Sequence, residues 1–161
     1  MNLVIANRQR TKKIDPRLLK QLAGALFAEL EISKAELGIN LVGAQEMARV
    51  NRQFLQHEGS TDVITFDHRN FELQIPDSQL EIYGELFICV DDAVAQAKEF
   101  GSSWQSEVVR YLVHGVLHLL GHDDLKPDLR RKMKRAENRL VRRLEERFSL
   151  AQLSRAAKIS A

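Results

Sequence analysis

The sequence has little cysteine and no long hydrophobic run. Its single cysteine, Cys89, has no partner within the chain, which excludes a disulfide framework and favours a reducing compartment. The apolar run over residues 3–6 is too short for the core of a signal peptide. No later run approaches the length of about 20 residues that a membrane-spanning helix needs. We therefore expect a cytoplasmic protein with no membrane partner.

Aromatic residues are also scarce, at 6% of the sequence, so no platform for stacking nucleobases is evident. The remaining composition, with 44% hydrophobic and 29% charged residues in a chain of 161, is typical of a globular protein. No linker, internal repeat or low-complexity tract divides the chain. We expect a single domain over residues 1–148, followed by a frayed tail over residues 149–161.

The net charge is only +2, but it is distributed unevenly along the chain. Residues 1–33 carry a net charge of +3, residues 34–125 one of −9, and residues 126–161 one of +8. Basic ends around an acidic middle suit a polyanion held by the ends and a cation held in the middle. A solvated C-terminal helix without a partner gives the same pattern, so charge alone leaves both interpretations open.

Strand and helix patterns alternate along the chain, which predicts an α/β (α+β) fold class. We expect one compact domain in which a small mixed sheet packs with helices around a central, buried helix. Ser102 or Ser103 is expected to cap this central helix, Gly121 to end it, and Asp91 or Asp92 to cap the helix before it. Strands are expected over residues 2–6, 35–42, 61–66 and 80–90, and a polar loop over residues 67–79. Five helices are expected. The first begins at Pro16, the second covers residues 44–54, the third ends at residue 100, the fourth ends at Gly121, and the fifth covers residues 126–148.

The most informative stretch is HGVLHLLGHDD, at residues 114–124. His114 and His118 stand four residues apart on one face of the expected central helix, close enough to share one cation. His122 continues the same spacing, but eight residues of helix span about 12 Å, so it cannot join them while the helix continues. Because Gly121 ends the helix, the chain can turn back and present either His122 or Asp124 to the ion.

Three protein ligands leave one position of a zinc ion open to water, which is the arrangement of catalytic rather than structural sites. A core without metal is the simpler interpretation, but it leaves two imidazoles and a carboxylate in need of partners, at about 1–3 kcal/mol each. Zinc peptidases with the H-E-x-x-H motif use the glutamate that follows the first histidine as general base. That position is Gly115 here, which disfavours a peptidase of this mechanism.

These residues resemble the signature of the YbeY-type bacterial rRNA maturation endoribonucleases, H-G-x-L-H-L-x-G-Y-D-H. TDVITF at residues 61–66 and GELFIC at residues 84–89 are similar to two strand motifs of the family, and MARVN at residues 47–51 precedes them in the expected order. Met133 and Glu137 lie in a C-terminal helix like the one in the family. The resemblance covers residues 2–147, and the histidine motif is its specific part.

The resemblance implies a compact α/β metallohydrolase domain with one zinc ion held by three side chains. It also implies single-strand endoribonuclease activity in rRNA maturation (16S rRNA 3′ end processing) and in ribosome quality control, with rRNA and the ribosomal small subunit as partners. His114 and His118 correspond to the first two ligands and to catalytic residues. The family's last histidine falls on Asp124, which we expect to be the third ligand and a catalytic residue too, with His122 as the alternative third ligand.

A second departure from the family pattern is at Leu55, where the family commonly has an arginine that faces the metal cleft. A leucine cannot bind a phosphate, so another cation is expected to help the metal to stabilise charge in the transition state. Arg52, His57 and Arg69 are the candidates nearby in the sequence. An ordinary surface position is the alternative interpretation for each of them.

The Arg-rich helix over residues 126–148 is expected to hold RNA phosphates without reading sequence. Asp123 or Asp62 is the candidate for moving a proton, although both fit helix or strand caps equally well. A non-catalytic ribosome assembly factor with a structural metal is the second hypothesis, and a zinc peptidase the third. The candidate RNA-binding residues are Arg130, Arg131, Lys134, Arg135 and Arg52, within a basic set that also includes Lys132, Arg139, Arg142, Arg143 and Arg147.

Overall fold

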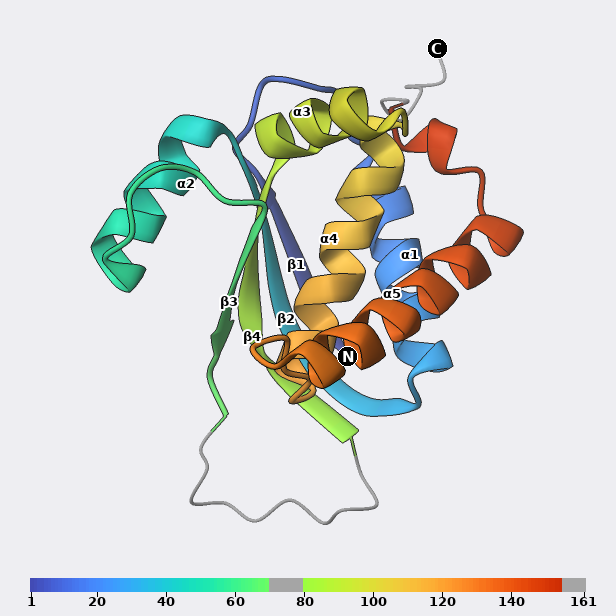
Figure 1. Ribbon diagram of the computed structural model, residues 1–161. Helices are drawn as coiled ribbons and strands as arrows, with labels where there is room; N and C mark the ends of the chain where they lie inside the picture. The colour runs from blue at the N-terminus through green and yellow to red at the C-terminus, as the bar shows by residue number, and fades with distance from the viewer. Residues whose placement is uncertain (70–79, 155–161) are drawn as a thin grey trace.

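A computed structural model describes residues 1–69 and 80–154 of the chain (Figure 1). Four strands form one sheet: β1 (Asn2–Asn7), β2 (Ile32–Val42), β3 (Val63–Asp67) and β4 (Leu80–Cys89), in the order β1-β2-β4-β3. β1, β2 and β4 are parallel to one another, whereas β3 is antiparallel to β4. The expected small mixed sheet is therefore confirmed. The expected polar loop falls mostly on residues 70–79, which lie outside the described residues.

Three helices lie on one side of the sheet and enclose the main core; the last of them packs mainly on the other two rather than on the strands. They are α1 (Pro16–Glu29), α4 (Trp104–Leu119) and α5 (Pro127–Arg147), and Figure 1 shows α4 lying over the strands with α5 crossing it. α4 buries most of its circumference, as predicted, because apolar residues occupy nearly every side of it. No helix among the described residues has the length and apolar character needed to cross a membrane.

A smaller core lies on the other face of the sheet, under α2 (Ala44–Val50). Met47 and Val50 of this helix pack there with Ile64 and Cys89. The sequence predicts one helix over residues 44–54, but the regular α-helix ends at Val50 and continues as a single π-helical turn, η1 (Asn51–Leu55). Gln56 then adopts a left-handed conformation, with φ +57°, and stops the turn.

α3 (Val90–Phe100) begins without the side-chain cap that the sequence predicts. Its N-cap is Cys89, because the helix follows β4 without a connecting loop. Asp91 instead accepts hydrogen bonds from the backbone of Ala44, at 2.6 Å, and from a threonine hydroxyl near the N-terminus. Asp92 accepts one from the Ser60 hydroxyl, at 3.0 Å. The two carboxylates therefore connect α3 to neighbouring segments rather than capping it.

Residues 150–154 belong to the segment 149–161 for which the sequence predicts a frayed tail, and the structure describes them as helical. Residues 150–154 form a short 3₁₀-helix, η2 (Leu150–Ser154), in which Leu150 and Leu153 are buried. The backbone N–H of Asp15 donates to the Leu153 carbonyl at 2.8 Å. Two apolar residues at a spacing of three therefore pack this segment against the start of α1.

A glycine in β4 allows β3 to lie close to it, and replacing this residue tests the packing. A Cβ atom on Gly84 would lie 2.4 Å from the carbonyl oxygen of Phe66 and 3.1 Å from the side chain of Leu119. We expect Gly84→Ala to lower the free energy of unfolding by about 1–3 kcal/mol, since a backbone atom cannot move aside as a side chain can.

The matched control is Gly24→Ala, because a Cβ atom at this helical position meets nothing within 4 Å. It should stabilise the protein by about 0.5–1 kcal/mol through helix propensity. Urea unfolding followed by circular dichroism measures both changes. Equal effects of the two substitutions would contradict the described β3–β4 packing.

Candidate metal centre

The end of α4 brings three side chains together. The helix stops after Leu119, and Gly121 adopts a left-handed conformation with φ +97°, as the sequence predicts. The backbone N–H of His122 donates to the Leu117 carbonyl at 3.0 Å, which turns the chain back along the helix. Asp124 thereby lies beside the last two turns of α4, which carry His114 and His118.

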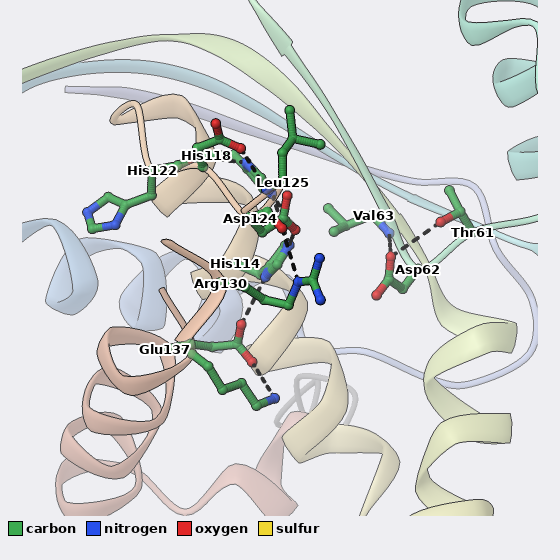
Figure 2. Close-up of polar contacts among 12 residues, drawn as sticks. Thr61, Asp62, Val63, His114, His118, His122, Asp124, Leu125, Arg130 and Glu137 are labelled. Carbon is green, nitrogen blue, oxygen red and sulfur yellow. Dashed lines mark hydrogen bonds and ion pairs between the residues drawn. The ribbon is translucent and has the colours of Figure 1, made fainter. Parts of the chain in front are cut away.

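The side-chain atoms of these three residues converge on one point (Figure 2). The Nε2 atoms of His114 and His118 are 3.1 Å apart. The Oδ2 atom of Asp124 lies 3.8 Å from the first of them and 3.5 Å from the second. Ligands at about 2.1 Å from a tetrahedral zinc ion are separated by about 3.4 Å, so the triangle of donor atoms fits such an ion.

Hydrogen bonds on the opposite side of each ring hold the two imidazoles in this orientation. The Nδ1 atom of His114 lies 2.9 Å from Oε2 of Glu137, and the Nδ1 atom of His118 lies 3.1 Å from the backbone carbonyl oxygen of His122. Both partners are acceptors, so each Nδ1 carries the proton and each Nε2 presents a lone pair. This is the arrangement by which proteins orient histidine ligands of metals.

Glu137 is the residue on which the orientation of His114 depends. Its side chain is buried in α5, only 4% exposed, and accepts further hydrogen bonds from Arg110, at 2.8 Å, and Lys134, at 3.4 Å. Burial alone would raise the pKa of this carboxyl group, but the hydrogen bonds from His114 and Arg110 outweigh it and lower the pKa to about 2. Glu137 is therefore a carboxylate at neutral pH. Burial lowers the pKa of His114, but the hydrogen bond to Glu137 and the negative charges of Glu137 and the neighbouring aspartates together raise it.

Sequence reasoning placed Glu137 in the last helix but missed its role, and it missed Arg110 entirely. One signal was available. Glu137 shares the apolar stripe of α5 with Met133, Leu140 and Leu144, all of them buried. An acidic residue within a buried stripe needs a partner, which Arg110 and His114 provide.

The imidazole of His122, the alternative third ligand, lies outside this cluster. Figure 2 shows its ring pointing away from Asp124 and His118. Partial burial, with Lys132 and His118 nearby, lowers the pKa of His122. What His122 contributes is its backbone carbonyl, which holds the ring of His118.

Two cavities meet at the cluster, and His114 lines both of them. The first, of about 420 Å³, lies between α3, α4 and α5 and is also lined by Asp62, Asp124 and Arg130. The second, also of about 420 Å³, lies between η1, β3 and α4 and is also lined by Leu55. The position where the family resemblance leads one to expect an arginine therefore faces the cluster, and a leucine occupies it.

Only some of the basic side chains that the sequence suggests for RNA binding line these cavities. Arg130 and Lys134 line the first cavity, and the Nε of Arg130 donates to the backbone carbonyl of Asp124 at 3.1 Å. Arg131 pairs with an aspartate of its own helix, and Arg135 is exposed. Arg52 is exposed on η1 and lines neither of the two cavities.

The other two candidates to replace the missing arginine differ in position. His57 lines the second cavity, together with Leu55 and His118. Arg69 pairs with Asp67, at 2.6 Å, at the far end of β3. Of the two candidate proton carriers, Asp62 lines the first cavity, whereas Asp123 accepts a hydrogen bond from the backbone of Leu125 at 2.8 Å and lines neither.

Gly115 explains in structural terms why no glutamate follows the first histidine. A Cβ atom there would lie 2.7 Å from the side chain of Leu86 in β4, which is fully buried. α4 can therefore lie close to the sheet only where this residue has no side chain. The geometry agrees with the sequence argument against a peptidase that uses this position as its general base.

Comparison with known proteins agrees with this architecture. The profile of the family described as endoribonuclease YbeY matches residues 4–145. The chain is 34% identical over 148 residues to the endoribonuclease YbeY of Syntrophotalea carbinolica, covering 89% of this chain and 96% of that protein. It is 38% identical over 125 residues to that of Myxococcus xanthus, covering 78% of this chain and 42% of that longer protein.

A solution structure of a protein from Thermotoga maritima has the same fold, with a TM-score of 0.66. It is 23% identical in sequence, and the match covers 99% of both chains. The family resemblance found in the histidine motif and the predicted fold class are thus both confirmed. On the extent of the profile match and the identity to these relatives, the chain belongs to the YbeY endoribonuclease family.

Proposed function

We propose that the chain is a zinc-dependent endoribonuclease that hydrolyses phosphodiester bonds of single-stranded RNA at the cluster of His114, His118 and Asp124. One observation supports this proposal: two imidazole nitrogens and one carboxylate oxygen converge on one point, and a hydrogen-bond acceptor at Nδ1 orients each imidazole ring. By analogy with the names of the relatives and the family resemblance, the substrate is rRNA, with 16S rRNA 3′ end processing and ribosome quality control as the roles.

The donor set favours zinc among the common metals. Imidazole nitrogen suits zinc and other transition metals, whereas magnesium and calcium prefer sites made of oxygen ligands alone. When bound, zinc would polarise a phosphoryl oxygen and make an attacking water more acidic. Three ligands from the chain leave a position for the substrate, and the two cavities on either side give an RNA strand access to it.

The surrounding residues divide the remaining tasks. Arg130 and Lys134 hold backbone phosphates at the first cavity, where they offset charge that develops on the phosphoryl group. Asp62, on the opposite wall of the same cavity, accepts hydrogen bonds through Oδ1 from the backbone of Val63, at 2.8 Å, and from the hydroxyl of Thr61. Its other oxygen remains available to take a proton from water.

The ligand assignment predicts different effects of two neighbouring substitutions. In Asp124→Ala the ion loses one of its three protein ligands, so the purified protein should contain much less than one zinc ion per chain. In His122→Ala the backbone carbonyl that holds His118 remains, so the zinc content should stay near one ion per chain. Elemental analysis of protein purified without a histidine tag measures both. Loss of zinc in His122→Ala alone would show that the assignment of the third ligand is wrong.

Glu137→Gln tests whether the bond to His114 Nδ1 supports metal binding. An amide keeps the size of the side chain but is a weaker acceptor, so we expect the zinc dissociation constant to rise 10- to 100-fold. Glu146→Gln, at an exposed position of the same helix, is the matched control. Competition with a chromophoric chelator measures the affinity, and thermal melting checks the fold. Unchanged affinity in Glu137→Gln would remove this role.

The activity itself is tested with zinc-loaded protein and a labelled single-stranded RNA. We expect cleavage that a chelator abolishes and added zinc restores, and no cleavage by His114→Ala, whose circular dichroism spectrum should match that of the unmodified chain. A folded, zinc-loaded protein that leaves every RNA intact would instead support a non-catalytic assembly factor.

The role of the basic helix predicts a change in salt dependence. In Lys134→Ala the slope of the logarithm of the RNA association constant against the logarithm of salt concentration should fall by about one, the effect of one lost phosphate contact. Lys20→Ala, at an exposed position of α1, should leave the slope unchanged. Fluorescence anisotropy at several KCl concentrations measures it. Equal slopes in both variants would show that Lys134 does not bind phosphate.

A further inference from the structure

The first cavity extends from the metal cluster along α4 to a region that the proposed chemistry does not use. His114 and Glu107 both line it, and residues seven apart lie on the same face of a helix, about 10.5 Å along its axis. Gln96 and Phe100 of α3 form the wall beside Glu107. The volume of about 420 Å³ lies within the range of small-ligand sites.

Glu107 offers an unpaired acceptor at this end of the cavity. Its residue is only 9% exposed, and its Oε1 atom accepts a hydrogen bond from the Ser102 hydroxyl at 3.0 Å. The other carboxylate oxygen has no partner within residues 1–69 and 80–154. Arg110, the nearest guanidinium on the helix, is bound instead to Glu137 and to Asn138, at 2.7 Å. Glu107 lines the cavity, so a ligand that brings hydrogen-bond donors can reach this oxygen.

Tyr111 adds a second polar group without a partner. It lies one helical turn after Glu107, is 4% exposed, and its hydroxyl has no hydrogen-bond partner among the described residues. Burial, with Asp62 and Glu107 nearby, raises the pKa of this hydroxyl, which therefore keeps its proton. The buried wall of the cavity thus combines an acceptor with a neutral hydroxyl.

Phe100 gives the rim of the cavity a flat apolar surface. It is the last residue of α3 and is 69% exposed, although an aromatic side chain is normally at least partly buried. Aromatic rings at the edge of a nucleic-acid site are surfaces on which single-stranded bases stack. The sequence, with few aromatic residues, gave no indication of such a surface, because only the fold brings Phe100 next to Glu107.

We infer that this end of the cavity binds the base of a nucleotide next to the cleaved phosphodiester, with Glu107 accepting hydrogen bonds from its edge and Phe100 stacking on its face. The inference rests on the proposed function for the position of the phosphate at the metal cluster. The phosphate of the nucleotide then lies at the metal end of the cavity, and the edge of its base lies at the Glu107 end.

The chemistry of Glu107 selects among the four bases. A carboxylate accepts hydrogen bonds but donates none. Guanine presents two adjacent donors on one edge, the ring N1–H and the exocyclic amino group, whereas the corresponding edge of uracil presents one donor between two carbonyl oxygens. The carbonyl oxygens are repelled by the carboxylate. Guanine is therefore the preferred base and uracil the least favoured.

Binding of mononucleotides to the zinc-loaded protein tests the inference without any cleavage. By isothermal titration calorimetry we expect GMP to bind on the order of tenfold more tightly than UMP, the factor that one good bidentate pair supplies. Glu107→Gln, of nearly the same size, should remove this preference, while Glu145→Gln, at an exposed position of α5, should retain it. Equal binding of GMP and UMP to the unmodified protein would overturn the inference, as would a preference that survives in Glu107→Gln.

A second variant keeps the test decisive if Glu107→Gln does not fold. Phe100→Leu removes the stacking surface at an exposed position, so it should weaken GMP binding several-fold without changing the melting temperature. Unchanged GMP binding in this variant would contradict the stacking role.

Cleavage mapping separates the failure of this inference from that of the proposed function. Sequencing the products of a random single-stranded RNA pool should show guanine enriched at one position next to the cut, and Glu107→Gln should remove the enrichment while cleavage continues. Cleavage with no base enriched at any position near the cut would overturn the inference and leave the endoribonuclease intact. GMP preference in a protein that cleaves no RNA would support the base site and contradict the proposed function.

Discussion

Two hydrogen bonds on the far sides of the imidazole rings determine what the end of α4 can do. Glu137 accepts from Nδ1 of His114, and the carbonyl of His122 accepts from Nδ1 of His118, so both Nε2 atoms face the same point as the Asp124 carboxylate. Without these acceptors either ring could rotate or shift its proton to Nε2, and the shared point would be lost. The candidate metal centre therefore depends on residues that contribute no atom to the cluster of donor atoms.

The burial of Glu137 explains how such an arrangement is maintained. A buried carboxylate is stable only when it is paired, and Arg110 and His114 supply the pairing from α4 while Glu137 itself belongs to α5. The contact between these helices therefore joins the packing of the core to the orientation of a ligand. Met133 and Leu140 lie on either side of Glu137 in the same buried stripe and hold α5 in place.

The surroundings of the metal centre are asymmetric, and this asymmetry bears on how RNA is held. The first cavity has Arg130 and Lys134 beside its carboxylates, whereas the second is lined mainly by neutral side chains, among them Leu55. The phosphate contacts of the substrate should therefore gather on the α5 side of the metal. Leu55 lines the second cavity at the position where the family resemblance leads one to expect an arginine.

The sequence alone determined the parts that depend on local spacing. The interval between His114 and His118 places them on one helical face, and Gly121 ends the helix because a residue without a side chain readily adopts a positive φ. Runs of β-branched or alternating apolar residues predicted the strands of the sheet, and the motif over residues 114–124 identified the family. Each of these inferences needs only neighbours within a few residues.

Only the tertiary structure decided between Asp124 and His122 as the residue beside the two histidines, because the path of the chain after Gly121 also depends on α5, from which Nε of Arg130 donates to the Asp124 carbonyl. The pairing of His114 with Glu137, 23 residues away, likewise requires α5 to fold back across α4. The capping role expected for Asp91 and Asp92 failed for a related reason, since segments distant in sequence provide their partners. Contacts between distant segments are set by packing, which residue spacing does not encode.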